Sequence, residues 1–462
     1  MNAGQGVFIM RRSRGKGGRT GMNFWNGAAD LKVMILGSVV ISLFAIYVCM
    51  KIYCRKYLFS VFNIGIFTEI FMVFIIPFMY EDKAWLAFGK DSAEPFYTFL
   101  NQNLEINLTG MIIFYLVLIV SEFRFVPRKS IVCGVIGRSV DTRVIWAVFY
   151  TAIIGWYLIV FLYNGTLPLL NGERDFYKKS RIANVLYILF NSSIPLLTVY
   201  FGFLSLKAGN VKNIFCFLMG ASACLFSGNR SDLLLKIVFP LMLIVLYKHG
   251  KNRINSTVKI CAGIGFILIA GLGISLLRSR GNTGPGAMLQ EFIYGNTFCD
   301  FRDGAFVLYG YHNQFDDFLY GKTYIAGLIS FIPSFLSEFK QTWGWGYFST
   351  DTLLNMPNHY GLRGGTYCEP YLNFGYVGII ICAVVQARWL AYKEGVFDKY
   401  LRGEISDFGK KYLIISLAQP VFQFVVSSNG LRTFYINFLV LAGAAVLLKG
   451  LIWLSNKQKS EG

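Results

Sequence analysis

The chain contains about eleven apolar runs of roughly 17–25 residues, the length that an α-helix needs to cross a lipid bilayer. Of its 462 residues, 55% are hydrophobic and only 15% are charged. Soluble domains carry roughly 25% charged residues, and a water-soluble core of this length could not hide so much apolar surface. The sequence therefore predicts an all-α, polytopic integral membrane protein.

The apolar runs divide the chain into membrane and loop regions. The expected spans are Val33–Tyr53, Leu58–Met79, Leu108–Phe125, Val144–Tyr163, Ala183–Leu206, Val211–Phe226, Leu233–Tyr247, Thr257–Leu277, Tyr371–Leu390, Tyr412–Ser427 and Phe434–Leu454. The resulting regions are a basic tail (1–32), a bundle of about eight helices (33–277), a large loop (278–367), about three C-terminal helices (368–454) and a short tail (455–462).

The segment Arg278–Tyr367 is the one large region expected outside the bilayer, and loops of this length are usually functional. Within it, Tyr324–Phe339 is apolar but too short to span and contains Pro333, so we expect an interfacial or re-entrant helix there. Lys and Arg are denser in the loops expected on the same side as the C-terminus. By the positive-inside rule, the C-terminus is predicted to be cytoplasmic and the large loop extracytoplasmic.

The formal net charge of +19 is explained in the same way, by basic side chains in cytoplasmic loops. No basic helix or RNA-binding motif accompanies it, so we expect no nucleic-acid partner. An odd number of spans places the N-terminus outside, although Met10–Arg19 is strongly basic. Either one span is miscounted or translation begins at Met22, and the second reading is favoured.

Metal chemistry is not expected. The nine cysteines are scattered and the sequence has only three histidines, with no spacing typical of a metal site.

Several arginines stand where spans are predicted to meet the outer face. They are Arg174, Arg230, Arg278, Arg280 and Arg363. Each can be read as a side chain that reaches out to the interface. As a set, however, they run against the charge bias, and the planar guanidinium suits bidentate phosphate contacts. Such arginines predict a site for a pyrophosphate at the membrane surface, with Arg230, Arg278, Arg280 and Arg363 as its candidate ligands.

The stretch "RGGTYCEPYLNFG" (363–375) supplies the candidate acid–base group. Glu369 either pairs with Arg363, acts as a general base or has a positioning or hydrogen-bonding role. His359 is the alternative base, or an ordinary loop histidine. The two glycines after Arg363 let the backbone approach a ligand closely.

The large loop also has the composition of a sugar-binding surface, which an aromatic belt at the interface explains equally well. The candidate sugar contacts are Arg174, Trp343, Trp345 and Asn373.

The order of these landmarks resembles a known family. "LFSGNRSDLLLKIVFPLMLIVL", "LLRSRGN", "GKTYIAGLISFIPSFLSEF" and "RGGTYCEPYLNFGYVGII" follow one another as in the Wzy-type polymerases of bacterial O-antigen, capsule and exopolysaccharide, and the similarity runs from Asn164 to Gly378. The arginines correspond by location, because the family's spacing from arginine to glycine is not reproduced here.

The resemblance implies a fold like that of the C-type glycosyltransferase superfamily. It implies oligosaccharide repeat units linked by pyrophosphate to a polyprenol as substrates, joined at the outer face of the bacterial inner membrane. It also implies a flippase and a chain-length regulator as partners, with no cofactor and no metal. A lipid-linked flippase or an O-antigen-type ligase remains the alternative.

Cys299 and Cys368 fall in or beside the large loop, in an oxidising compartment in many bacteria. They are predicted either to form a disulfide or to remain two separate thiols.

Overall fold

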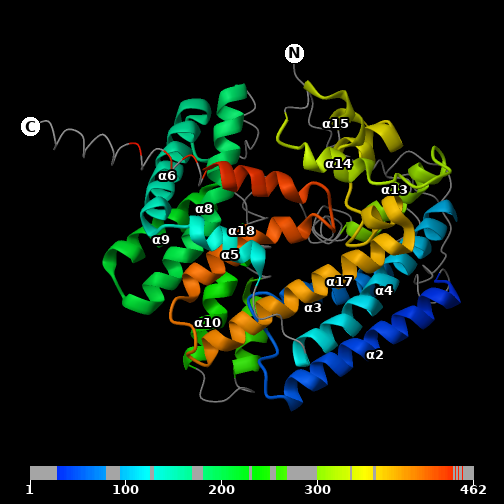
Figure 1. Cartoon of the computed structure of the whole chain (residues 1–462), viewed down its shortest axis with the longest axis horizontal. Helices are drawn as coiled ribbons and strands as arrows, with labels where there is room; N and C mark the ends of the chain where they lie inside the picture. The colour runs from blue at the N-terminus through cyan, green and yellow to red at the C-terminus, as the bar shows by residue number, and fades with distance from the viewer. Residues whose placement is uncertain are drawn as a thin grey trace, which may run out of the picture.

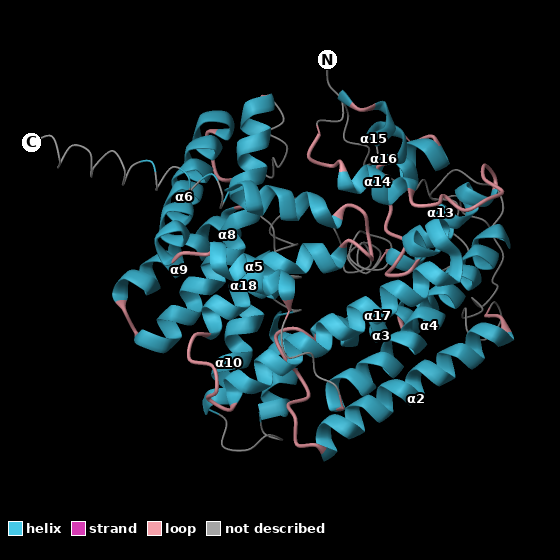
Figure 2. Ribbon diagram, in the orientation of Figure 1, coloured by secondary structure: helices cyan, strands magenta, loops and turns pink. Residues whose placement is uncertain are grey.

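The computed structural model describes residues 29–79, 94–124, 130–168, 180–227, 232–249, 256–267, 299–332, 336–356 and 361–440, together with 443, 446 and 450. These residues form helices and turns, with no strand among them, as the apolar periodicity predicts (Figure 2). Five helices in this part of the chain are long and apolar enough to cross a membrane. The total of about eleven spans stays a prediction.

The five long helices are α2 (Leu31–Tyr53), α4 (Glu94–Phe123), α6 (Thr142–Asn164), α8 (Arg181–Ala208) and α17 (Cys368–Leu401). Shorter apolar helices are α3 (Ile64–Phe74), α9 (Val211–Phe226), α10 (Phe239–His249) and α18 (Phe408–Gln423), with a π-helical turn at Asp232–Val238 before α10. The helical turns at 256–267 and 430–440 belong to the last expected spans of each bundle.

The helices pack in two groups, each around its own apolar cluster. In one, α4 lies between α2 and α17, with α13 (Asp300–His312) against the same helix (Figure 1). In the other, α8 packs against α6, α9 and α18. Helix α17 joins the two groups, because residues from Cys368 to Ala391 belong to the first cluster and Phe397 belongs to the second.

Several expected spans have different bounds in the structure; α17, for example, ends at Leu401 rather than at Leu390. Helix α3 covers only part of Leu58–Met79, because the chain passes into a 3₁₀ turn, Ile76–Met79, that contains Pro77. Helix α4 begins at Glu94, well before the predicted start at Leu108. Its first turns mix polar and apolar residues, so hydropathy alone assigned them to a loop.

The predicted outer loop contains more packed structure than expected. Helix α13 is largely buried against α4. The single helix expected over Tyr324–Phe339 is instead two, α14 (Lys322–Leu328) and α15 (Glu338–Trp343). Two short turns follow, α16 (Trp345–Tyr347) and a π-helical turn at Phe348–Thr352.

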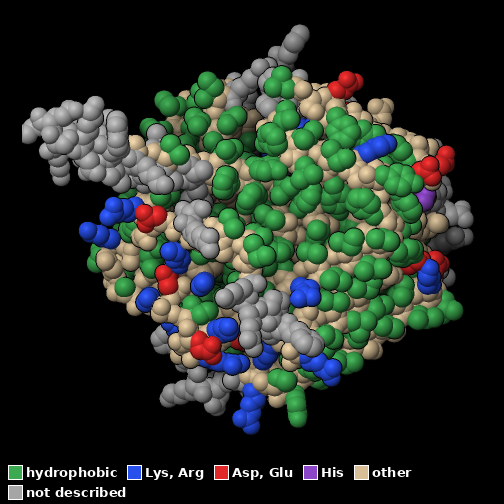
Figure 3. Space-filling view, in the orientation of Figure 1, with side chains coloured by type: hydrophobic (Ala, Val, Ile, Leu, Met, Phe, Trp, Pro, Cys, Tyr) green, Lys and Arg blue, Asp and Glu red, His purple; other side chains and the backbone are tan. Residues whose placement is uncertain are grey.

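The molecule has distinct ends. Helices α13, α14 and α15 lie at the opposite end from the C-terminal ends of α2 and α17 (Figure 1). In the space-filling view, apolar side chains cover most of the visible face, and Lys and Arg gather toward its lower margin (Figure 3). This is the surface expected for a protein embedded in lipid. Which end faces the cytoplasm stays a prediction.

Candidate functional site

The stretch that leads into α17 lies against the protein interior. Gly365 has a left-handed backbone (φ 82°), and a Cβ there would come within 2.7 Å of Asn107 Oδ1. A Cβ at Gly364 would come within 2.5 Å of Cys368. The two glycines are therefore required for close packing against these side chains of α4 and α17, whatever approaches from outside.

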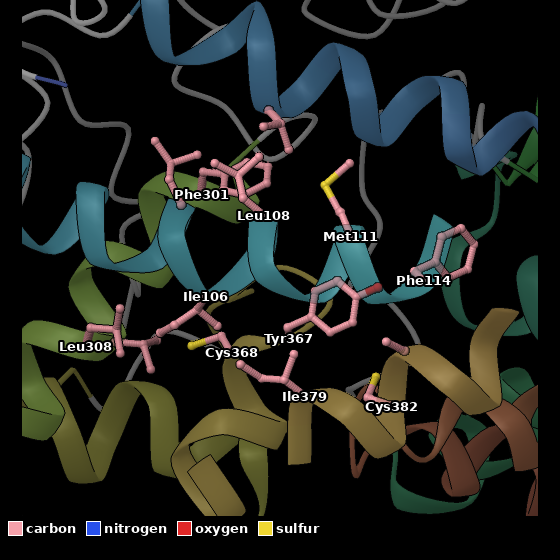
Figure 4. Packing of buried hydrophobic residues seen from close by; sticks show 14 of the residues in the cluster. Ile106, Leu108, Met111, Phe114, Phe301, Leu308, Tyr367, Cys368, Ile379 and Cys382 are labelled. Atoms are coloured by element: carbon pink, nitrogen blue, oxygen red, sulfur yellow. The ribbon is translucent and has the colours of Figure 1, made fainter. Parts of the chain in front are cut away.

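Tyr367 fixes this stretch onto α4. Its side chain is 1% exposed, and its ring covers Gly110, where a Cβ would lie 2.5 Å from ring carbons. Asn107 Oδ1 also accepts a hydrogen bond from Tyr367 N at 3.3 Å. Figure 4 shows Tyr367 and Cys368 among apolar side chains of α4 and α17. The position of Arg363, four residues earlier, is thus set by a rigid anchor.

Arg363 itself is half exposed, and its side chain lies beside α13. Its Nε is 3.3 Å from Asp300 Oδ1, with the side chains 53% and 19% exposed. Its backbone N–H donates a long hydrogen bond, 3.4 Å, to Asp303 Oδ2. Burial lowers the pKa of the Arg363 guanidinium, but its interactions with Asp300, Cys299 and Asp303 together raise the pKa by more, so the net shift is upward. The side chain stays cationic.

A second arginine, Arg302, belongs to the same cluster and was missed in the sequence. Asp303 Oδ1 accepts hydrogen bonds from Arg302 Nε at 3.1 Å and Nη2 at 2.7 Å. Asp303 is buried, with 3% of its surface exposed. Because its two oxygens accept hydrogen bonds from the side chain of Arg302 and from the backbone of Arg363, it holds the two residues together. The available signal was "DFRDG" (300–304), whose acidic residues three apart share one face of a helical first turn.

The other three arginines of the predicted pyrophosphate site, Arg230, Arg278 and Arg280, lie outside the described residues. So do Arg174, a predicted sugar contact, and His359, the alternative base. Their part in the site stays a prediction.

Glu369 is buried, with 2% of its surface exposed, and Arg363 contacts Asp300 instead of this carboxylate. Glu369 Oε1 accepts a hydrogen bond from Thr323 Oγ1 at 2.8 Å, and Oε2 accepts one from Ser428 N at 3.1 Å. Glu369 therefore links α17 to α14 and to the turn after α18. In this conformation it is a group that holds three segments in place.

Asn373 extends the network around Glu369. Its Nδ2 donates to Thr323 Oγ1 at 2.8 Å and to the carbonyl of Glu369 at 2.9 Å, and its side chain is fully buried. Its Oδ1 has no hydrogen-bond partner among the described residues. The predicted contact between Asn373 and a sugar would require this amide to become exposed.

Helix α17 is broken one turn after Glu369. Gly375 has φ 60° and ψ −145°, a conformation open almost only to glycine, and this interrupts the helical hydrogen bonds. The carbonyls of Leu372 and Asn373 accept hydrogen bonds from Leu319 N at 2.9 Å and Tyr320 N at 3.1 Å instead. The break joins the loop 313–321 to the start of α17 through backbone contacts. Sequence reasoning expected an unbroken helix here.

The two predicted sugar-stacking tryptophans differ in accessibility. Trp345 is 6% exposed and donates from Nε1 to the Leu362 carbonyl at 3.0 Å, so it offers no open ring face. Trp343 is partly exposed, but the Nζ of Lys322 lies 4.4 Å from its ring centroid and Phe348 stacks against it. Both rings are therefore used in packing this part of the loop.

A carboxylate from the predicted second span also reaches this stretch. Glu69 Oε1 on α3 accepts a hydrogen bond from Thr366 Oγ1 at 2.9 Å. Its sequence signal was its position as a lone acid within Leu58–Met79, since ionisable groups inside a span are usually functional.

Cys299 and Cys368 are both buried free thiols, so the predicted disulfide is not formed. Within the described residues, no group of three or more His, Cys, Asp and Glu side chains could hold a metal ion. Two hollows found in the described part of the chain are lined mainly by apolar side chains, and neither includes Arg363 or Glu369.

Comparisons with models of known families, with curated proteins and with solved structures found no match to this chain.

Proposed function

We propose that this protein is a glycosyltransferase that joins polyprenyl-pyrophosphate-linked oligosaccharide repeat units into a surface polysaccharide. The growing chain is transferred from its lipid pyrophosphate to the next repeat unit, and the lipid pyrophosphate leaves. The proposal rests on the order of sequence landmarks shared with the Wzy-type polymerases. It is supported by the apolar helices, which would keep the enzyme where lipid-linked substrates lie.

One observation supports a chemical role for a specific residue in this reaction. Arg363 is half exposed, cationic, and held by contacts with Asp300 and Asp303 at the junction of the predicted loop with α17. Cleavage of the bond between sugar and phosphate develops negative charge on the leaving pyrophosphate. A guanidinium fixed before the reaction stabilises that charge without reorganisation. Arg302, with its nearby guanidinium, adds positive potential, partly offset by Asp303.

Glu369 contributes by position. Because both of its oxygens accept hydrogen bonds from α14 and the 424–429 turn, it fixes the first turn of α17 against these elements. That turn carries the rigid Arg363–Tyr367 segment.

The finer topology belongs to the same proposal. Arg363 and α13 would face the outer side of the bacterial inner membrane, and the C-terminus would be cytoplasmic. About eleven spans would surround the site. A flippase that delivers repeat units and a regulator of chain length would be the functional partners.

The test is complementation in a strain that lacks this gene, with the surface polysaccharide examined by gel. Arg363→Lys keeps the charge but loses the planar fork, and removal of one strong transition-state contact typically lowers the rate by about 10²–10³. We expect short chains or single repeat units from this variant. Lys248→Arg is a matched control, since Lys248 lies at the other end of the molecule on α10. Full-length polymer from Arg363→Lys at normal protein levels would contradict the assignment.

The same strain separates the alternatives. Loss of a ligase leaves polymer on its lipid carrier, whereas loss of a polymerase leaves single repeat units transferred to the surface. Loss of a flippase leaves repeat units inside the cell.

A further inference from the structure

The proposed site has Arg363 to bind the pyrophosphate. It also needs a group that accepts the proton of the attacking sugar hydroxyl. Glu369 is 2% exposed, and both of its oxygens already accept hydrogen bonds. To reach a sugar, it would have to give up its contacts with Thr323 and Ser428. A general base must lie within hydrogen-bond reach of the proton that it takes.

Asp300 meets this requirement better. It is the first residue of α13, and its Oδ1 lies 3.3 Å from Arg363 Nε without the geometry of a hydrogen bond. The same oxygen has no other hydrogen-bond partner in the described part of the chain. A buried carboxylate oxygen that lacks a donor is costly, so the Asp300 carboxylate gains from a new hydrogen bond, and a substrate hydroxyl can approach it through the exposed part of the side chain. The side chain is 19% exposed, whereas its neighbour Asp303 is 5% exposed and occupied by Arg302.

We propose that Asp300 is the general base of the transfer reaction; this inference rests on the proposed function. Asp300 takes the proton from the acceptor hydroxyl as that oxygen forms a bond to the anomeric carbon of the growing chain. The bond from the same carbon to the pyrophosphate oxygen breaks, and its electron pair leaves with the lipid pyrophosphate beside Arg363. The proton stays on Asp300 until the products depart. These steps account for the bond formed, the bond broken, the electron pair and the proton without a further reactant.

The adjacency of Asp300 and Arg363 fits both roles. The nucleophile and the leaving group bond to one carbon, so the base and the phosphate ligand must lie within a few ångströms of a shared centre. Before substrate binds, each side chain neutralises the other. When pyrophosphate engages Arg363, Asp300 loses part of this electrostatic stabilisation and becomes a stronger base.

The charged surroundings of Asp300 give it a suitable proton affinity. Burial raises the pKa of this carboxyl, Arg363 opposes the rise, and Asp303 adds to it. Glu69 on α3 interacts with Asp300 as a like charge, and Cys299 precedes it in the chain. The net direction is upward from the ordinary aspartate range near 3.9, toward the pH at which a base works efficiently.

The experiment compares Asp300→Asn, Asp300→Glu and the wild-type protein, each purified in detergent and also expressed in the deletion strain. Binding of inorganic pyrophosphate is measured by calorimetry, and polymer formation by gel. For Asp300→Asn we expect pyrophosphate affinity equal to or higher than that of wild type, because a negative charge beside Arg363 is removed. Polymer formation should fall by about 10²–10⁴, the usual contribution of a positioned base. Asp300→Glu should recover part of it.

A role limited to holding Arg363 gives a different pattern. Asp300→Asn would then lose pyrophosphate binding together with polymer formation, as Arg363→Lys does, and the inference would be overturned. The inference would also be overturned if Asp300→Asn formed polymer at the wild-type rate. If His359→Gln lost activity in that case, the base would be His359. Asp351→Asn, an exposed loop carboxylate, is the matched control and should leave both readouts unchanged. If deletion of the gene leaves the polysaccharide unaltered, the proposed function fails before this question arises.

Discussion

The buried ion pair between Lys51 and Glu394 makes the most quantitative prediction about how the first helix group is held together. The two side chains are 1% and 2% exposed and form a short contact between α2 and α17. Lys51 Nζ is also 3.3 Å from Glu122 Oε1 on α4, and Ser60 Oγ donates to Glu394. One ammonium group therefore sits between two buried carboxylates from different helices.

Lys51→Met removes that ammonium and keeps most of the side chain's volume. Glu394 is then left buried with the hydroxyl of Ser60 as its one described hydrogen-bond partner, whereas Glu122 retains Lys56 at 3.3 Å and the hydroxyl of Tyr47. Removal of one partner of a buried pair typically destabilises a protein by about 3–5 kcal/mol. We expect a loss of that order in Lys51→Met.

The opposite end of α2 supplies a matched control. Lys32 pairs with Glu105 at 2.5 Å, but the side chains are 66% and 21% exposed. Exposed pairs contribute about 0–1 kcal/mol, so Lys32→Met should change stability little. Retention of the monodisperse peak after heating, by fluorescence-detected size-exclusion chromatography at one heating rate, ranks the variants.

The double variant Lys51→Met with Glu394→Leu tests the cause. It removes both charges of the pair, so most of the lost stability should return, because replacement of a buried pair by apolar groups is often close to neutral. If Lys51→Met unfolds at the same temperature as Lys32→Met, the burial argument is refuted. If the double variant is no better than Lys51→Met, the unpaired carboxylate is not the cause.

Three further predictions concern the segment around the candidate site. Gly110→Leu should displace Tyr367 from α4 and destabilise the protein by at least the ~1–3 kcal/mol typical of overpacking, measured in the same heating assay. Gly134→Leu is the control and should not destabilise the protein, because a Cβ at Gly134 meets open space. Gly375→Ala should cost about 1–3 kcal/mol, because alanine is strained at φ 60° and ψ −145°, and a melting profile like that of wild type would argue against the break in α17. Burial raises the pKa of the Cys299 thiol to about 12, so only about one molecule in 10⁴ carries the reactive thiolate at pH 8. Maleimide labelling of Cys299 in the folded protein should therefore be slow at pH 8 and faster as pH rises; rapid labelling at pH 8 would contradict its burial.

The sequence best predicted the features that depend on many consecutive residues, namely the long apolar helices. Long apolar runs predicted the helices α2, α6 and α8 to within a few residues, because the bilayer sets both their length and their composition. Hydropathy failed at the start of α4, whose first turns carry several polar residues; one of them, Asn103, donates a hydrogen bond to the Phe301 carbonyl of α13 at 3.1 Å.

Details that depend on tertiary contacts were not accessible in the same way. Gly375 was noted in the sequence, but a lone glycine in an apolar run does not indicate a break in the helix. Nor does it indicate that the backbone N–H groups of Leu319 and Tyr320 donate to the helix carbonyls that the break leaves free. Similarly, nothing local indicates that Arg363 contacts Asp300, which lies 63 positions earlier, rather than Glu369, six positions later. Side-chain pairing across that distance depends on how α13 packs on α4.

The arginine pattern, by contrast, singled out a residue that lies in a cluster of charged side chains in the structure. Arg363 was singled out because it runs against the charge bias, and it is half exposed and lies in a cluster of opposite charges. Arg302 escaped attention because it lies mid-loop, away from any predicted span. Its side chain is only 11% exposed and donates hydrogen bonds to Asp303, which the local sequence does not indicate.

The most direct test of the proposed function is the stoichiometry of lipid release. Purified protein is reconstituted into vesicles with polyprenyl-pyrophosphate-linked repeat units isolated from the deletion strain. Free polyprenyl pyrophosphate and polymer length are then followed together by mass spectrometry and gel. We predict one polyprenyl pyrophosphate released for each new linkage, with no added nucleotide sugar, and loss of both signals in Arg363→Lys. Lipid-linked repeat units that remain intact in the presence of active wild-type protein, or that only change sides of the vesicle, would contradict the account.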